Sequence, residues 1–342
     1  MTHSHGEFSA PRFDPDEAVA VAEQPDPAAT YREKPVVITG AAGFVGTRVC
    51  THLVERGFKV RALVRNATKA AERLGHLRLE IRSGDIRDAE SMRSAFHEAG
   101  AIVHLAAIAI EKNGQSYEDT NANATKNIVD CAKAERVERI VYMSQNGADS
   151  KSPYRFLSSK GVAEDIVKGS GLKWSVLRPS VIFGPDDEFV NVLARLVRLS
   201  PLLYPLPGGG VARFQPVAVG DVAQAVLKCL EDDSTINHTY DIGGAVPVNL
   251  RQMAERILVA MNASRILVGV PVAVLRPIIA LAQRLLPRPP VTTSLLDLLD
   301  IDNVVPKNDL VGELRIAPVP FAPEELLYLR KISFGDAVRS ML

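Results

Sequence analysis

The chain has 342 residues, of which 46% are hydrophobic and 23% charged, and its formal net charge at pH 7 is +0. This is an ordinary globular composition, and the length favours one large domain or two interlocked ones. The neutral balance gives no electrostatic basis for nucleic-acid binding. The three cysteines lie far apart, so we expect reduced thiols in a cytoplasmic protein rather than a disulfide framework.

The first 34 residues differ in composition from the rest of the chain. They contain four prolines and many acidic residues but almost no large aliphatic side chains. Such a segment buries too little apolar surface to offset the entropy of ordering, so we expect residues 1–34 to form a disordered tail. The segment also lacks the apolar core of a signal peptide.

From about residue 35 the chain alternates short apolar strands with amphipathic helices. Predicted strands are 34–40, 59–65, 77–85, 101–107, 138–144 and 173–179. Predicted helices are 41–57, 67–75, 89–100, 124–135 and 158–171. Apolar strands that alternate with helices indicate a parallel sheet covered on both faces. The predicted fold class is therefore α/β, with a doubly wound parallel Rossmann sheet.

Beyond Pro179 the alternation is less regular. The pattern predicts helices over 189–203, 220–232 and 250–262, a loop over 205–210, strands over 212–219 and 238–244, and a mostly helical, apolar end over 266–342. No hinge-like linker separates two parts of the chain. We expect a disordered tail over 1–34, a Rossmann domain over 35–183 to which 214–246 returns, and an interwoven, smaller, mostly helical substrate or partner domain over 184–213 and 247–342.

The most apolar stretch of the chain is residues 266–287. It contains Arg276, Pro277, Gln283 and Arg284, whereas a membrane-spanning helix needs about 20 apolar residues with few or no charges. We therefore expect no transmembrane helix. The favoured interpretation is a short strand followed by a buried helix. The alternative is an exposed apolar helix that docks on a membrane or a partner protein.

The sequence "TGAAGFVG" places Gly40, Gly43 and Gly46 directly between a predicted strand and a predicted helix. Glycines at this spacing allow a tight turn, a close approach of the backbone to a pyrophosphate, and close packing of the helix on the sheet. The helix N-terminus then offers free N–H donors to the phosphates. The pattern predicts a dinucleotide site in which Phe44 and Val45 also take part.

The end of the second predicted strand distinguishes the two nicotinamide cofactors. A carboxylate about 20 residues beyond the glycines would bind a ribose 2′-hydroxyl, but this sequence has Arg65 there, with Lys69 close by. A guanidinium matches the geometry of a phosphate group. We therefore expect NADP(H) to be preferred over NAD(H).

Several further motifs give the chain, from about residue 35 to 340, a resemblance to the short-chain dehydrogenase/reductase superfamily, in its extended or atypical branch. These motifs are the glycine turn, "SGDIRD", "HLAA", "TNANATKN", "LRPSVIFGP" and "VAVGDVA". The resemblance implies that cofactor-binding residues include Asp85, Ile86, Ala106, Ala107, Asn121, Lys160 and Pro179.

Three later segments narrow the resemblance. The sequences "FQPVAVGDVAQAV", "YDIGG" and "LLPRPPVTTSLLDLLDIDNVV" are similar to a subgroup that holds the Rossmann-fold accessory subunit of respiratory complex I and its bacterial relatives. The resemblance implies tightly held NADPH without established turnover, and a respiratory-chain or membrane-associated protein as a partner. It also implies a cytoplasmic protein that lies peripheral to the inner membrane.

The superfamily's catalytic unit is a tyrosine, a lysine four residues later, and an earlier serine or threonine. Lys160 and Ser144 match this pattern, but Phe156 occupies the tyrosine position, and a phenyl ring has no proton to donate. Tyr154 lies two residues earlier and is the candidate substitute, provided that it precedes the helix. Glu164 is expected to form an i,i+4 pair with Lys160.

His104, inside a predicted strand, is expected to be a hydrogen-bonded core residue. No cluster of His, Cys and acidic residues has the spacing of metal ligands, so no metal is expected. The favoured function is an NADP(H)-binding accessory, structural or sensor protein with an impaired proton relay. The alternative is an NADPH-dependent oxidoreductase or epimerase in which Tyr154, Ser144 or a water donates the proton.

Overall fold

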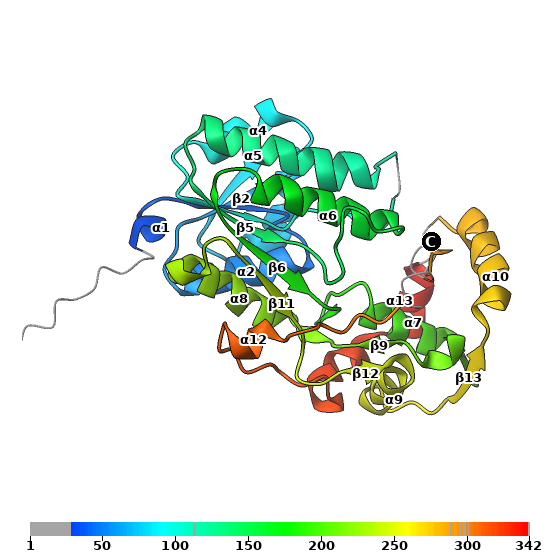
Figure 1. Ribbon diagram of the computed structural model, residues 1–342. Helices are drawn as coiled ribbons and strands as arrows, with labels where there is room; N and C mark the ends of the chain where they lie inside the picture. Colours follow the sequence, from blue (N-terminus) through cyan, green and yellow to red (C-terminus); the bar gives the residue numbers. More distant parts are fainter. Residues whose placement is uncertain are drawn as a thin grey trace, which may run out of the picture.

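The computed structural model describes residues 29–111, 114–287, 289, 291–293, 296, 299 and 301–340. Its centre is a seven-stranded parallel sheet with the strand order β11-β6-β5-β4-β1-β2-β3 (Figure 1). The strands are β1 (Val36–Thr39), β2 (Val60–Val64), β3 (Glu80–Ser83), β4 (Ala101–His104), β5 (Arg139–Met143), β6 (Lys173–Pro179) and β11 (His238–Ile242). The order reverses between β1 and β4, which confirms the doubly wound Rossmann prediction.

Helices cover both faces of the sheet, and each face has its own apolar core (Figure 1). One face carries α2 (Phe44–Glu55), α3 (Ala67–Leu74) and α8 (Val219–Glu231), and the other carries α4 (Ala89–Phe96), α5 (Ala124–Ala134) and α6 (Arg155–Lys168). Strands β1, β4 and β5 are buried along their whole length. Burial on both faces explains why these strands are continuous apolar runs rather than alternating ones.

A third apolar core lies beyond the carboxyl end of the sheet and is built from later parts of the chain. Its helices are α7 (Val190–Leu199), α9 (Leu250–Ala260) and the 3-10 helix η4 (Pro323–Lys331), and α13 (Phe334–Arg339) packs against α7. Its short strands are β7 (Ile182–Phe183), β8 (Leu203–Pro207), β9 (Arg213–Phe214), β10 (Val217–Ala218) and β12 (Val248–Asn249). The intervening segments α8 and β11 return to the Rossmann sheet.

Remaining short helices are α1 (Ala29–Glu33), η1 (Glu118–Asn123), η2 (Gly208–Gly210), η3 (Asp233–Thr235) and α12 (Asp309–Gly312). Residues 1–28 of the expected tail lie outside the described residues. The rest of that tail is ordered, because Tyr31 of α1 is buried in the core beside the sheet. The helix expected over 189–203 ends at Leu199, since Pro201 disfavours helical backbone at Ser200.

The stretch 266–287 forms strand β13 (Ile266–Val270), which pairs with β8, and helix α10 (Val272–Leu285). The strand-plus-helix prediction is confirmed, but its expected burial is wrong: α10 has no buried residue. Figure 1 shows the helix at the edge of the molecule, away from the central sheet. The spacing of apolar residues alone does not show whether another element covers the apolar face of α10. Among the described residues, none belongs to a helix both long and apolar enough to span a bilayer.

Candidate functional site

The glycine turn between β1 and α2 has the close backbone packing that its sequence predicts. Gly40 has a φ of +70°, and a Cβ there would lie 2.9 Å from the backbone nitrogen of Ala106. A Cβ on Gly46 would lie 2.1 Å from the carbonyl oxygen of Gly40. Both positions therefore require glycine. The turn leaves the N-terminus of α2 open to the groove beside it, as a pyrophosphate requires.

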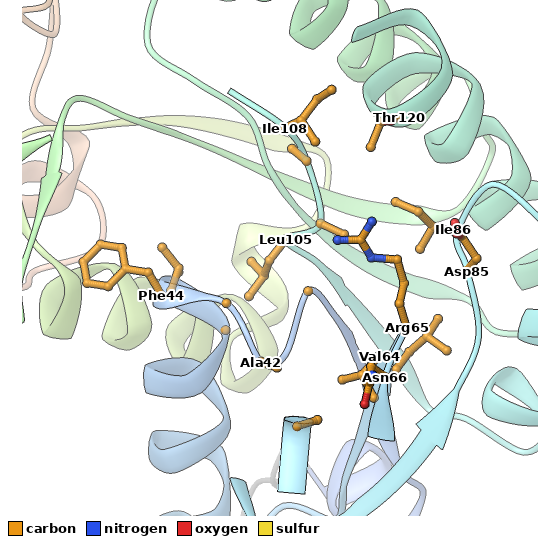
Figure 2. Close-up of a pocket in the computed structure, with 18 of the residues that line it drawn as sticks. Ala42, Phe44, Val64, Arg65, Asn66, Asp85, Ile86, Leu105, Ile108 and Thr120 are labelled. Atoms are coloured by element: carbon orange, nitrogen blue, oxygen red, sulfur yellow. The ribbon is translucent and has the colours of Figure 1, made fainter. Parts of the chain in front are cut away.

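A groove of about 750 Å³ runs along this turn at the carboxyl edge of the sheet (Figure 2). Most of the residues predicted to bind the cofactor line it: Gly40, Gly43, Phe44, Val45, Gly46, Arg65, Asp85, Ile86, Ala106 and Ala107. Three predicted residues, Asn121, Lys160 and Pro179, do not. Sequence reasoning missed Arg73, Arg87, Asp186 and Glu188, which also line the groove. The position of the groove at the switch point is where open α/β sheets bind ligands.

The groove is strongly polar where β2 and β3 end. Figure 2 shows the Arg65 side chain extending from the end of β2 into the groove, with its guanidinium between Leu105 and Ile86 in this view. Arg87 donates two side-chain hydrogen bonds to Asp85, of 3.0 and 2.6 Å. These bonds, with a smaller contribution from the charge of Arg65, hold the pKa of Asp85 below its usual value. Asp85 is therefore ionised and already paired, whereas Arg65 is exposed.

His104 at the end of β4 is a buried structural residue, as its position in the strand predicts. Its Nε2 lies 2.9 Å from the hydroxyl of Thr125, which donates its own proton to the Asn121 carbonyl. Nε2 must therefore carry the ring proton, and Nδ1 accepts from the hydroxyl of Thr39 at 2.8 Å. Burial lowers the pKa of His104 to about 3, so the ring is neutral.

Asn121 acts on the groove indirectly. Its side-chain oxygen accepts a hydrogen bond of 2.9 Å from the backbone of Ile108, and its amide donates one of 3.1 Å to the Ile108 carbonyl. The same amide donates to the Ser159 hydroxyl at 3.0 Å. Ile108 itself lines the groove. The Asn121 side chain therefore fixes the segment that follows β4, which forms one wall of the site.

Lys160 lies inside the protein rather than at the groove. Its ammonium group donates a hydrogen bond of 2.6 Å to the Met143 carbonyl and lies 4.6 Å from the centre of the Tyr142 ring. Burial lowers the pKa of Lys160 to about 7, and nearby Glu164 only partly offsets this effect. The lysine is thus held by the backbone of β5.

Glu164 forms a buried polar network with partners other than the expected one. Its carboxylate accepts two hydrogen bonds of 2.7 Å from Arg178 and one of 2.8 Å from Lys168. It also accepts a bond of 2.5 Å from the Ser144 hydroxyl. The i,i+4 pair of Glu164 is therefore with Lys168 and not with Lys160. Burial raises the pKa of Glu164, but these hydrogen bonds outweigh burial and hold it below its usual value.

Comparison with known proteins agrees with this geometry. A family model described as NAD(P)H-binding matches residues 40–233, more than half of the chain. The chain belongs to this NAD(P)H-binding family. It is a Rossmann protein of the short-chain dehydrogenase/reductase type, as its motifs predict.

Two relatives of this NAD(P)H-binding protein are named as respiratory subunits. Alpha subcomplex subunit 9 of mitochondrial NADH dehydrogenase (ubiquinone) from Arabidopsis thaliana is 30% identical over 227 residues, which are 64% of this chain and 56% of that protein. The chain thus spans little more than half of that relative. The mitochondrial NADH-ubiquinone oxidoreductase 40 kDa subunit of Neurospora crassa is 23% identical over 300 residues, or 86% of this chain and 78% of that protein.

A solved structure shows the same fold. The UDP-glucose 4-epimerase of Thermus thermophilus, in complex with NAD, superposes with a TM-score of 0.67 and 23% identity. The match covers 87% of this chain and 99% of the epimerase. At this level of identity the likeness concerns the fold, an epimerase/dehydratase-like Rossmann architecture.

The tyrosine position of the NAD(P)H-binding protein is occupied by a packed phenyl ring. Phe156 lies in α6 with its ring 5.7 Å from that of Tyr117. Tyr154 immediately precedes α6 and is 38% exposed, so it does precede the helix. Neither Tyr154 nor Ser144 lines the groove. In the part of the chain that the structure describes, no group of three or more His, Cys, Asp and Glu residues could hold a metal ion.

Proposed function

We propose that this protein binds NADP(H) in preference to NAD(H) and holds it as a structural or regulatory ligand, in an accessory role. The observation that carries the proposal is Arg65. It lines the groove at the end of β2, where a carboxylate would serve NAD(H). Within the described ranges, Arg65 has no hydrogen bond or ion pair to another residue. A 2′-phosphate therefore meets an exposed guanidinium that no carboxylate contacts directly.

The state of the predicted catalytic residues supports a held cofactor over a rapidly turning-over one. Phe156 has no hydroxyl, the ammonium of Lys160 donates to a backbone carbonyl, and the hydroxyl of Ser144 donates to Glu164. A proton relay needs these groups to contact the substrate or the cofactor. In this arrangement Lys160 and Ser144 are bonded to the protein instead, and Phe156 has no proton to donate.

The proposal is tested by purifying the protein without added nucleotide, denaturing it, and identifying what is released. Near one-to-one NADP(H) is the expected result. Release of NAD(H), or equal affinity of the empty protein for NADH and NADPH, would contradict the cofactor preference. Reduction of small carbonyl compounds at an ordinary enzymatic rate would contradict the accessory role.

One observation favours the alternative of an NADPH-dependent oxidoreductase or epimerase. The phenol of Tyr154 is partly exposed beside the N-terminus of α6, and in the described structure its side chain makes no hydrogen bond. A proton donor at this place, or Ser144 or a water, would replace the missing tyrosine. Any activity should then disappear in Tyr154→Phe. Unchanged rates in that variant would exclude the tyrosine route.

We also propose that the chain divides into a Rossmann unit, residues 35–183 with 214–246, and a partner-binding unit, residues 184–213 and 247–342. Most of the apolar core supports this division, because the two cores on the sheet are built largely from the first unit and the third core largely from the second. The exception is the segment around α12, where Leu310, Leu314 and Ile316 pack in a core of the Rossmann sheet. The respiratory names of the relatives favour a membrane-associated respiratory-chain protein as the partner. The protein would then act in the cytoplasm, at the periphery of the inner membrane.

Helix α10 is the proposed contact with that partner. Val274, Ile278, Leu281 and Leu285 recur at helical spacing, so they form one stripe along the helix. Their exposed fractions range from 53% to 71%. Residues 256–296 contain five arginines and no acidic residue. An apolar stripe in a basic segment suits a partner surface that is apolar with an acidic rim.

A further inference from the structure

An ion pair lies at the nucleotide groove near the glycine turn. Arg73, in the last turn of α3, lies 2.6 Å through its Nη2 from Oδ2 of Asp186. Its Nη1 also donates a hydrogen bond of 3.1 Å to the carbonyl of Ala42, inside the glycine turn. All three residues line the groove. The pair therefore borders the groove between the glycine turn and α3, the helix that follows Arg65.

Asp186 is presented by a turn that is fixed independently of the pair. The neighbouring Asp187 is buried and caps α7: its carboxylate accepts backbone hydrogen bonds of 2.8, 2.5 and 3.2 Å from Phe189, Val190 and Asn191. Asp186 takes no part in this cap. Its side chain is 64% exposed and that of Arg73 is 43% exposed. The carboxylate of Asp186 can therefore separate from Arg73 without disturbing the cap that holds the backbone of the turn.

Arg73 belongs to the basic wall of the groove. Lys69 and Arg73 are four residues apart on α3, so they share one face of that helix, and they come four and eight residues after Arg65. Asp186 and Glu188 line the groove on the segment after β7. A basic wall and an acidic segment thus meet at the groove, and Arg73 is the arginine that the acidic segment neutralises.

We infer that Arg73 is a second ligand of the cofactor's 2′-phosphate, after Arg65, and that Asp186 holds Arg73 in the absence of the cofactor. An exposed ion pair contributes little stability, so it opens readily. A phosphate carries more negative charge than a carboxylate and accepts two parallel hydrogen bonds from a guanidinium. NADP(H) therefore displaces Asp186, and the carboxylate acts as a competitor that weakens cofactor binding.

This inference rests on the proposed NADP(H) preference, and the test separates the two. Dissociation constants for NADPH and NADH would be measured for the wild type, Arg73→Gln and Asp186→Asn. The matched control is Asp130→Asn, which breaks an exposed ion pair with Lys126 on α5 and removes the same charge far from the groove.

The two variants should act in opposite directions on NADPH alone. Arg73→Gln should weaken NADPH binding by about tenfold or more, because a charge-assisted hydrogen bond is lost. Asp186→Asn should tighten it about two- to fivefold, the value of an exposed ion pair. A gain in affinity cannot arise from misfolding. Asp130→Asn should change neither affinity.

Two patterns would overturn the inference while leaving the cofactor preference intact. In the first, the wild type prefers NADPH but neither variant changes that preference. In the second, Arg73→Gln weakens NADPH and NADH equally, which places Arg73 on the pyrophosphate. A wild type that binds NADPH and NADH equally well would instead contradict the proposed function itself.

Discussion

The hydroxyl of Ser144 donates a hydrogen bond of 2.5 Å to Oε1 of Glu164, so the serine at the end of β5 is part of a buried ionic network. The same carboxylate accepts from Arg178 on β6 and from Lys168 on α6. Because Glu164 is almost fully buried, its charge depends on these donors. Ser144 therefore helps to bind α6 to the sheet, whatever its relation to a cofactor.

We predict that Glu164→Gln lowers the free energy of unfolding by about 3 kcal/mol, because it leaves the guanidinium of Arg178 without its counter-ion. Urea unfolding measures this loss. Glu138→Gln is the matched control: Glu138 pairs with Lys173 at an exposed site, and its loss should cost less than about 1 kcal/mol. The folded Glu164→Gln protein should bind NADPH normally, since Glu164 does not line the groove. A large loss of affinity would show that the network reaches the cofactor.

A second prediction concerns Arg65. Arg65→Gln should weaken NADPH binding by about tenfold and leave NADH binding unchanged, because only NADPH carries the phosphate that the guanidinium would bind. Isothermal titration with both cofactors measures the two affinities. Arg78→Gln, which removes an exposed arginine outside the groove, serves as the control. If both cofactors lost affinity equally, Arg65 would contact a part that they share.

The third prediction is a pH dependence that Lys160 causes. Its pKa is about 7 in the folded protein against 10.5 for an ordinary lysine. Between these values the unfolded chain binds a proton that the folded chain lacks, so the stability contributed here rises with pH. Below about pH 7 both states are protonated, and the folded state retains the full cost of a buried charge.

Lys160→Met should therefore have a higher free energy of unfolding than the wild type at about pH 6. This advantage should shrink by about 1.4 kcal/mol per pH unit above pH 7. Urea unfolding at a series of pH values measures the difference between the two proteins. Lys126→Met, which changes an exposed lysine on α5, should show no such trend. Parallel stability curves for Lys160→Met and the wild type would mean that the buried amine is not titrating in this range.

The fourth prediction tests α10 as the partner contact. All three natural cysteines are buried, so Ile278→Cys provides one exposed thiol for a crosslinker. In native membranes it should capture a subunit of a respiratory NADH dehydrogenase, identified by mass spectrometry. Val246→Cys, at an exposed site outside α10, should not. If the protein adsorbed to protein-free anionic vesicles as well as to native membranes, a lipid surface rather than a protein would be favoured as the contact of α10.

Local sequence was sufficient for the turn and the strand ends, but not for contacts between distant segments. Gly40, Gly46 and Arg65 could be predicted to lie at the groove because their places follow from the strand and helix on either side. Asp186 reaches the groove only because the chain after β7 returns to α3, and it is 113 residues from its partner Arg73. Glu164 shows the same difficulty, since its strongest partner, Arg178, lies on another element.

The fifth prediction is that restoring the missing tyrosine does not restore catalysis. Phe156→Tyr recreates the spacing of tyrosine and lysine, but the ammonium of Lys160 still donates to Met143 and the hydroxyl of Ser144 to Glu164. The new phenol would therefore lack the nearby charge that lowers its pKa and the hydroxyl that orients a substrate. We expect NADPH oxidation with small carbonyl compounds to stay at the wild-type level, with Tm unchanged within a few degrees. Clear turnover by Phe156→Tyr would show that both side chains leave these partners once the nucleotide is bound, and that one substitution separates this protein from an active reductase.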